Sequence, residues 1–161
     1  MRPEDDDYTR LALGDYDDDG YADVLISDRG LWRNLGGSGR FKRVDQELGL
    51  DIKGRSAVFA DFNNDGHLDL SITNCYRVWM NPFYEGAGDG FFLDVTFRTG
   101  AFAFSACGQA AADFDNDGEH DLFVTALLFF CPLIQYNNGE FHGYRPANRK
   151  PDKSLCTRFH S

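Results

Sequence analysis

An aspartate-rich loop that recurs three times is the feature that most constrains how this chain folds. The segment LALGDYDDDGYADVLIS returns as AVFADFNNDGHLDLSIT and as QAAADFDNDGEHDLFVT, and the nine-residue loops start at Asp15, Asp61 and Asp113. The loop starts are 46 and 52 residues apart, a spacing typical of repeats that each form one supersecondary unit, such as a propeller blade. The 161 residues are therefore interpreted as a single domain of three repeats with a C-terminal tail, at approximately residues 8–50, 54–100, 105–147 and 148–161.

The segments that follow each loop carry the same strand and turn signals. A β-rich apolar stretch comes first, a second apolar segment ends in an asparagine, and a glycine-containing turn precedes a strand that starts with phenylalanine. The asparagines are Asn34, Asn81 and Asn137, and the phenylalanines are Phe41, Phe92 and Phe141. With the strand before each loop, each repeat has four antiparallel strands, the content of one blade. We therefore predict an all-β fold of three four-stranded antiparallel β-propeller blades, with at most one helical turn, at residues 45–50.

Oxygen-bearing side chains occupy loop positions 1, 3, 5 and 9 in every copy, and glycine occupies position 6. A hard cation such as calcium takes about 6 to 8 oxygen ligands, which alternate positions of a tightly turned loop can supply while glycine permits the reversal. Position 7 would add a backbone carbonyl. Magnesium fits less well, because it demands octahedral geometry and usually keeps several waters. Three calcium sites are therefore predicted, with the ligands Asp15, Asp17, Asp19, Tyr21, Asp23, Asp61, Asn63, Asp65, His67, Asp69, Asp113, Asp115, Asp117, Glu119 and Asp121.

Two other interpretations of the loops, an EF-hand and a simple turn, are less consistent with the sequence. An EF-hand needs a bidentate glutamate at position 12 and a helix on each side, whereas position 12 is Ile26, Ile72 or Val124 inside an apolar stretch. Asp, Asn and Gly are ordinary turn residues, but turn formation alone does not explain three copies with matching positions. The eleven carboxylates at the ligand positions would repel one another without a cation. We therefore expect calcium to contribute to the folding free energy.

The loop pattern DxDxDGxxD, together with its surroundings, resembles a known repeat family. Apolar strands flank the loop, and an apolar-x-Asn segment, a glycine-rich turn and a Phe-x-x-Val or Phe-x-Asp-Val strand follow it. Over about residues 11–144 this pattern is similar to the FG-GAP/VCBS repeats, which include the integrin α-subunit β-propeller. The resemblance implies four-stranded blades, calcium in the loop between the first two strands, and roles in adhesion, ligand binding or assembly. Family propellers have roughly seven blades, so three repeats are an incomplete propeller unless other copies or a partner complete it.

Composition narrows the range of partners. The formal charge of −10 argues against nucleic acid, whose partners carry a basic stripe. The longest apolar run, residues 123–134, contains Pro132 and is too short to span a membrane. No secretory signal is visible at the start, but an extracellular location is expected from the resemblance and from four cysteines, an even number that favours disulfides. Three pairings are open, and Cys75 with Cys107 is the one we favour.

The sequence favours an interaction module over an enzyme. His67 and His120 lie at loop positions 7 and 8, where side chains face away from a metal, and the spacing reveals no catalytic constellation. We expect a calcium-stabilised module for adhesion or self-assembly, completed as a homo-oligomer, a filament or a complex with another subunit. A carbohydrate-binding, lectin-like propeller is an alternative, with residues 81–88 read as a lengthened loop whose Phe83 and Tyr84 could stack on sugars. A scaffold fragment of a larger secreted enzyme is another.

Overall fold

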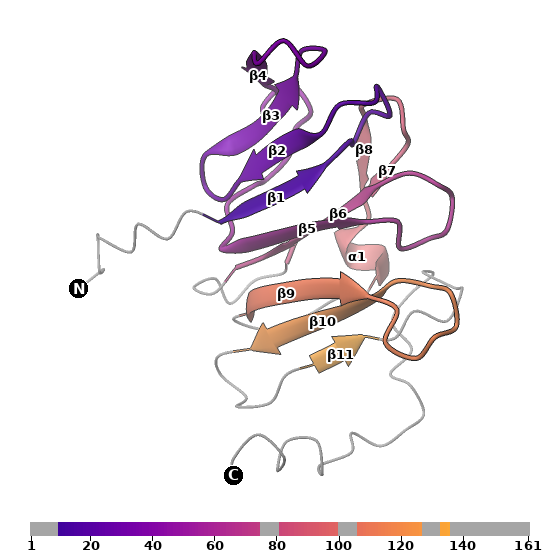
Figure 1. The fold of residues 1–161 in the computed structure, drawn as a ribbon. Coiled ribbons are helices and arrows are strands. Elements are labelled where there is room, and N and C mark those ends of the chain that lie inside the picture. Colours follow the sequence, from indigo (N-terminus) through magenta and orange to yellow (C-terminus); the bar gives the residue numbers. More distant parts are fainter. Residues whose placement is uncertain (1–9, 75–80, 100–105, 127–132, 136–161) are drawn as a thin grey trace, which may run out of the picture.

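The computed structural model describes residues 10–74, 81–99, 106–126 and 133–135 as three antiparallel sheets and one short helix (Figure 1). In the first sheet, the strands are β1 (Leu11–Gly14), β2 (Asp23–Ile26), β3 (Gly30–Asn34) and β4 (Phe41–Arg43). In the second, they are β5 (Ser56–Ala60), β6 (Asp69–Thr73), β7 (Phe83–Gly86) and β8 (Phe92–Asp94), followed by α1 (Thr96–Thr99). In the third, they are β9 (Ala106–Ala112), β10 (Asp121–Ala126) and β11 (Leu133–Gln135). Every strand pairs with the next along the chain within its sheet, which confirms the all-β prediction.

Alternating burial and left-handed turn residues explain the first sheet. In β1, Ala12 is buried between the exposed Leu11 and Leu13, because successive side chains of a strand point to opposite faces. Ala12 lies opposite Leu25 of β2, which is also buried. Between β3 and β4, the glycines at residues 36, 37 and 39 have φ values of 70°, 68° and 72°. Glycine adopts this left-handed conformation without a Cβ clash, so the predicted tight turn is confirmed.

The three sheets contact one another face to face, and their cores lie between them. The first strands are neighbours, since β1 contacts β5 and β5 contacts β9, and Figure 1 shows β1, β5 and β9 in this order from top to bottom. The core between the first and second sheets includes Leu25, Leu31, Leu70, Ile72 and Tyr84. The core between the second and third includes Phe62, Phe83, Val95, Leu122 and Val124. The second sheet therefore buries side chains on both of its faces.

Residues 81–88 differ from the sequence-based expectation of a lengthened loop. They contain β7, and Tyr84 of β7 pairs with Leu70 of β6 as Trp32 pairs with Val24 in the first sheet. Phe83 and Tyr84 are 1% and 4% exposed. The loop interpretation was therefore wrong, and these two rings do not form the exposed sugar-stacking surface that the sequence left open.

The strand end that matches Asn34 is also different from the one predicted. The backbone N–H of Asn34 donates to Asp23, and in the second sheet the backbone N–H of Gly86 donates to Asp69 in the same way. Gly86, and not Asn81, is therefore the structural counterpart of Asn34.

The ends of the sheets add two details. Residues 45–49 form hydrogen-bonded turns after β4, and α1 occupies the same place after β8; the sequence did not predict α1. The predicted strand at Phe141 and the tail at 148–161 lie outside the described residues, so the third sheet is described with three strands. Cys107 in β9 is disulfide-bonded, and the other three cysteines also lie outside this part. No helix among the residues that the structure describes is long and apolar enough to cross a membrane.

Candidate metal sites

The three aspartate-rich loops, residues 15–23, 61–69 and 113–121, have the same backbone conformation. Position 4 has φ values of 54°, 57° and 61°, and position 6 has φ values of 88°, 90° and 93°. The residues are Asp18 and Gly20, Asn64 and Gly66, and Asn116 and Gly118. Asp, Asn and Gly tolerate positive φ better than other residues. The similar spacing in the sequence therefore produces three similar turns in space.

The side chain at position 1 holds each turn closed. In the first loop, Asp15 accepts hydrogen bonds from the backbone N–H groups of Asp19 (3.0 Å) and Gly20 (2.8 Å). In the second and third loops, the corresponding distances are 3.2 and 2.9 Å, and 3.2 and 3.0 Å. Position 5 accepts from the backbone N–H of position 7, at 3.0, 2.9 and 2.9 Å. Each loop is thus shaped by its own carboxylates.

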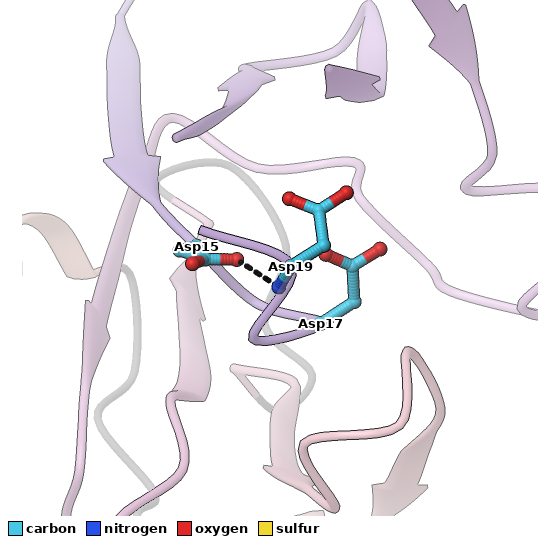
Figure 2. A group of neighbouring side chains, drawn as sticks. All are labelled: Asp15, Asp17 and Asp19. Carbon is cyan, nitrogen blue, oxygen red and sulfur yellow. Dashed lines mark hydrogen bonds between the residues drawn. The ribbon is translucent and has the colours of Figure 1, made fainter. Parts of the chain in front are cut away.

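The side chains at positions 1, 3 and 5 converge. In the first loop, Asp15, Asp17 and Asp19 each offer an oxygen within 4.8 Å of the others, and Figure 2 shows the carboxylates of Asp17 and Asp19 beside each other. The third loop brings Asp113, Asp115 and Asp117 together in the same way. The second loop has Asn63 at position 3, and its Nδ2 donates to Asp65 (2.9 Å). Clustered carboxylate and amide oxygens are the donors that calcium prefers.

Asp17 is the strongest sign that a cation belongs in the first loop. Its side chain is 4% exposed, and among the described residues neither carboxylate oxygen has a hydrogen-bond donor. The nearby charge is that of Arg33, whose Nε lies 2.5 Å from Oδ2 without hydrogen-bond geometry. Burial raises the pKa of Asp17. A buried carboxylate without hydrogen-bond donors is costly unless cations compensate it. Arg33 does so only in part, and this donor set fits a calcium ion.

Position 9 is occupied by buried aspartates that brace the loops. Asp23, Asp69 and Asp121 are at most 1% exposed, and each accepts the backbone N–H of position 2, at 3.2, 2.9 and 2.8 Å. The other oxygen of Asp23 and of Asp69 accepts from the third strand of its sheet, at 2.7 and 3.0 Å. The sequence placed position 9 among the calcium ligands, which stays a prediction. Its bracing of backbone amides was not visible in the sequence.

Residues 15–72 match the FG-GAP-like repeat family. The chain carries an FG-GAP-like repeat. The matched stretch contains the first two aspartate-rich loops and ends within β6. The FG-GAP-like assignment therefore rests on the region whose strand–loop–strand geometry is described above.

A protein with a similar sequence is cartilage acidic protein 1 of Xenopus tropicalis. It is 27% identical to this chain over an alignment of 134 residues, and the match covers 76% of this chain and 20% of that protein. The similarity thus extends beyond the FG-GAP-like match. The chain corresponds to about a fifth of its relative's length.

Side chains at loop positions 4, 7 and 8 connect each aspartate-rich loop to the next one along the chain. Nδ1 of His67 lies 2.6 Å from Oδ2 of Asp18, and Asp18 raises the pKa of this imidazole. Nδ1 of His120 lies 3.2 Å from the backbone oxygen of Asp61. The sequence predicted that both histidines face away from a metal. It did not predict that they bridge the loops, because the partners are 49 and 59 residues distant in the chain.

The bracing aspartates predict a pH effect on the stability of this protein without calcium. Burial raises the pKa of Asp69 from 3.8 to about 6. Between these values the folded state binds more protons at Asp69 than the unfolded state, so this group contributes less stability as the pH rises. We expect the free energy of unfolding of the wild type, relative to Asp69→Asn, to fall between pH 4 and pH 6 in chelator. Urea unfolding across this range measures it, and a constant or rising difference would contradict the pKa assignment.

Proposed function

We propose that this chain is a calcium-binding, extracellular module of β-propeller blades that acts in adhesion or self-assembly rather than in catalysis. The observation that carries the proposal is the repeated turn geometry of the three loops, with converging carboxylates at positions 1, 3 and 5 of the first and third loops and a buried Asp17 that lacks hydrogen-bond donors. The FG-GAP-like match supports the same conclusion.

The residues at positions 1, 3 and 5 would hold the ion, with the carbonyl of position 7 and the carboxylate of position 9 completing the site. Calcium would supply positive charge to a cluster of carboxylates. The chain itself supplies the shape, since position 1 closes the turn and position 9 ties it to the third strand. Calcium in this arrangement stabilises a fold; it does not activate a substrate.

Exposed apolar groups on the outer sheets support assembly. Leu11 and Leu13 of β1 are 62% and 65% exposed. The aromatic residue at loop position 2 is buried in the first two loops, as Tyr16 and Phe62, but Phe114 in the third loop is 43% exposed. Tyr16 stacks on Phe92 of the next sheet, with ring centroids 5.5 Å apart. We therefore propose that further blades, from other copies, a partner subunit or a longer chain, cover the outer faces.

The proposed location outside the cell rests on two observations. Cys107 is disulfide-bonded, and disulfides persist mainly in oxidising compartments. The similar amphibian protein carries cartilage in its name. Both agree with a secreted adhesion or assembly module.

Calcium stoichiometry tests the proposal. Isothermal titration of the full chain is expected to give three sites, and Asp115→Ala to remove one, because Asp115 is an exposed ligand side chain at position 3 of the third loop. Glu47→Gln is the matched control: Glu47 pairs with Lys42 at the surface, away from every loop, and this variant should keep three sites. A wild type that binds no calcium, or an Asp115→Ala variant that keeps three sites, would overturn the assignment.

A further inference from the structure

The residue of the third strand that faces loop position 3 has opposite charge in the first two sheets. Trp32 of β3 and Tyr84 of β7 pair with the residue that directly follows the position-9 aspartate. The next residues along the two strands, Arg33 and Glu85, therefore occupy equivalent places. Both reach the loop of their own sheet.

In the first sheet, Arg33 supplies a cation to the loop. Its Nε lies 2.5 Å from Oδ2 of Asp17, and its terminal nitrogen lies 3.4 Å from Oδ2 of Asp19. A guanidinium keeps its charge at all relevant pH values. Arg33 thus partly neutralises two of the three carboxylates at positions 1, 3 and 5.

In the second sheet, Glu85 places a negative charge beside position 3 instead. Its Oε1 accepts a hydrogen bond from Nδ2 of Asn63 (3.0 Å), the side chain at position 3. Arg98 lies 3.9 Å from the other oxygen, at a longer distance than those of the Arg33 contacts. The side chains at positions 1, 3 and 5 plus the strand residue sum to a formal charge of −2 in the first sheet and −3 in the second.

We propose that the first two loops are unequal calcium sites, with the second tighter because Glu85 adds negative charge beside the loop and the first weaker because Arg33 competes with the ion. This inference rests on the proposed function. The number and charge of oxygen donors tune calcium affinity, and Arg33 must release Asp17 and Asp19 before both can turn to an ion. Arg33 and Glu85 are thus positioning and affinity-setting residues outside the loop motif.

A calcium titration of the full chain, followed by NMR, distinguishes the two sites. The backbone amides of Gly20 and Gly66, at position 6 of the first and second loops, report each site separately in calcium-buffered solutions. We expect Gly66 to reach its midpoint at lower free calcium than Gly20. Arg33→Gln should lower the Gly20 midpoint about tenfold, and Glu85→Gln should raise the Gly66 midpoint about tenfold, because one unit charge close to the ion changes in each.

Two controls match these charge changes outside the nine-residue loops. Arg40→Gln and Glu47→Gln remove charges of the same signs from exposed positions, and both midpoints should stay at wild-type values. If Arg33→Gln does not fold, Arg33→Lys keeps the charge on a flexible ammonium that lacks the planar fork, and should lower the Gly20 midpoint about threefold. Equal midpoints in the wild type, or variants that behave like the controls, would overturn this inference alone. Absence of calcium-dependent shifts at both glycines would overturn the proposed function itself.

Discussion

Calcium is expected to raise the melting temperature of this protein by roughly 15–30 °C relative to the protein in chelator. When the free calcium concentration is about 100 times the dissociation constant, an ion that binds only the folded state adds about 2.7 kcal/mol per site to the free energy of unfolding. Three independent sites therefore add about 8 kcal/mol. For a chain of this size, 1 kcal/mol corresponds to about 2–4 °C. Circular dichroism melts in buffered calcium and in chelator measure the difference.

A magnesium series provides the control for this melt. Magnesium at the same concentration should give a smaller increase, because it retains its waters and needs strict octahedral geometry. Identical melting temperatures in calcium and in chelator would show that the loops are stable turns without an ion. The hydrogen bonds donated to Asp15, Asp61 and Asp113 would then be sufficient to hold them.

Phe62→Ala is expected to destabilise the protein by about 3–5 kcal/mol, because it empties a fully buried site. Phe62 is 0% exposed, lies in the core between the second and third sheets, and has its ring centroid 5.2 Å from that of Phe83. Since Phe62 is also position 2 of the second loop, its loss should weaken calcium binding there. Urea unfolding measures the first effect, and the Gly66 amide reports the second.

Two phenylalanines serve as graded controls for Phe62. Phe114 has the same loop position in the third loop but is 43% exposed, so Phe114→Ala should lower the free energy of unfolding by clearly less than Phe62→Ala does. Phe91 is 65% exposed outside the loops, and Phe91→Ala should cost under about 1 kcal/mol. Equal losses for Phe62 and Phe114 would contradict the different burial of the two rings.

The strands next to the loops were predictable, whereas β7 was not. The loop motif fixes a strand on each side, so β1, β2, β5, β6, β9 and β10 lie where the repeats indicate. In the second repeat, Asn81 has the same sequence surroundings as the asparagine that ends β3. The sequence pattern alone does not show whether the extra residues of this repeat come before or after its third strand. Only the pairing of Tyr84 with Leu70 decides this, and it is a contact between distant residues.

In the candidate sites too, contacts within one loop were predictable from the sequence, whereas contacts between a loop and the third strand were not. In the first and third loops, the carboxylates at positions 1, 3 and 5 come together because they share one tight turn, which the spacing in the sequence encodes. The influence of Arg33 and Glu85 depends on the third strand lying beside the loop, and each is more than ten residues from the side chain it contacts. The bracing by Asp23 and Asp69 likewise requires that strand.

Adjacent residues of β7 belong to different cores, since Phe83 packs toward the third sheet and Tyr84 toward the first. A repeat of this kind has no complete interior of its own, and most of its apolar burial is shared with its neighbours. The middle repeat has two such shared boundaries, and each of the others is described with one. Cooperativity therefore resides at the boundaries between repeats, and the outermost repeat at any free end is the first to fray.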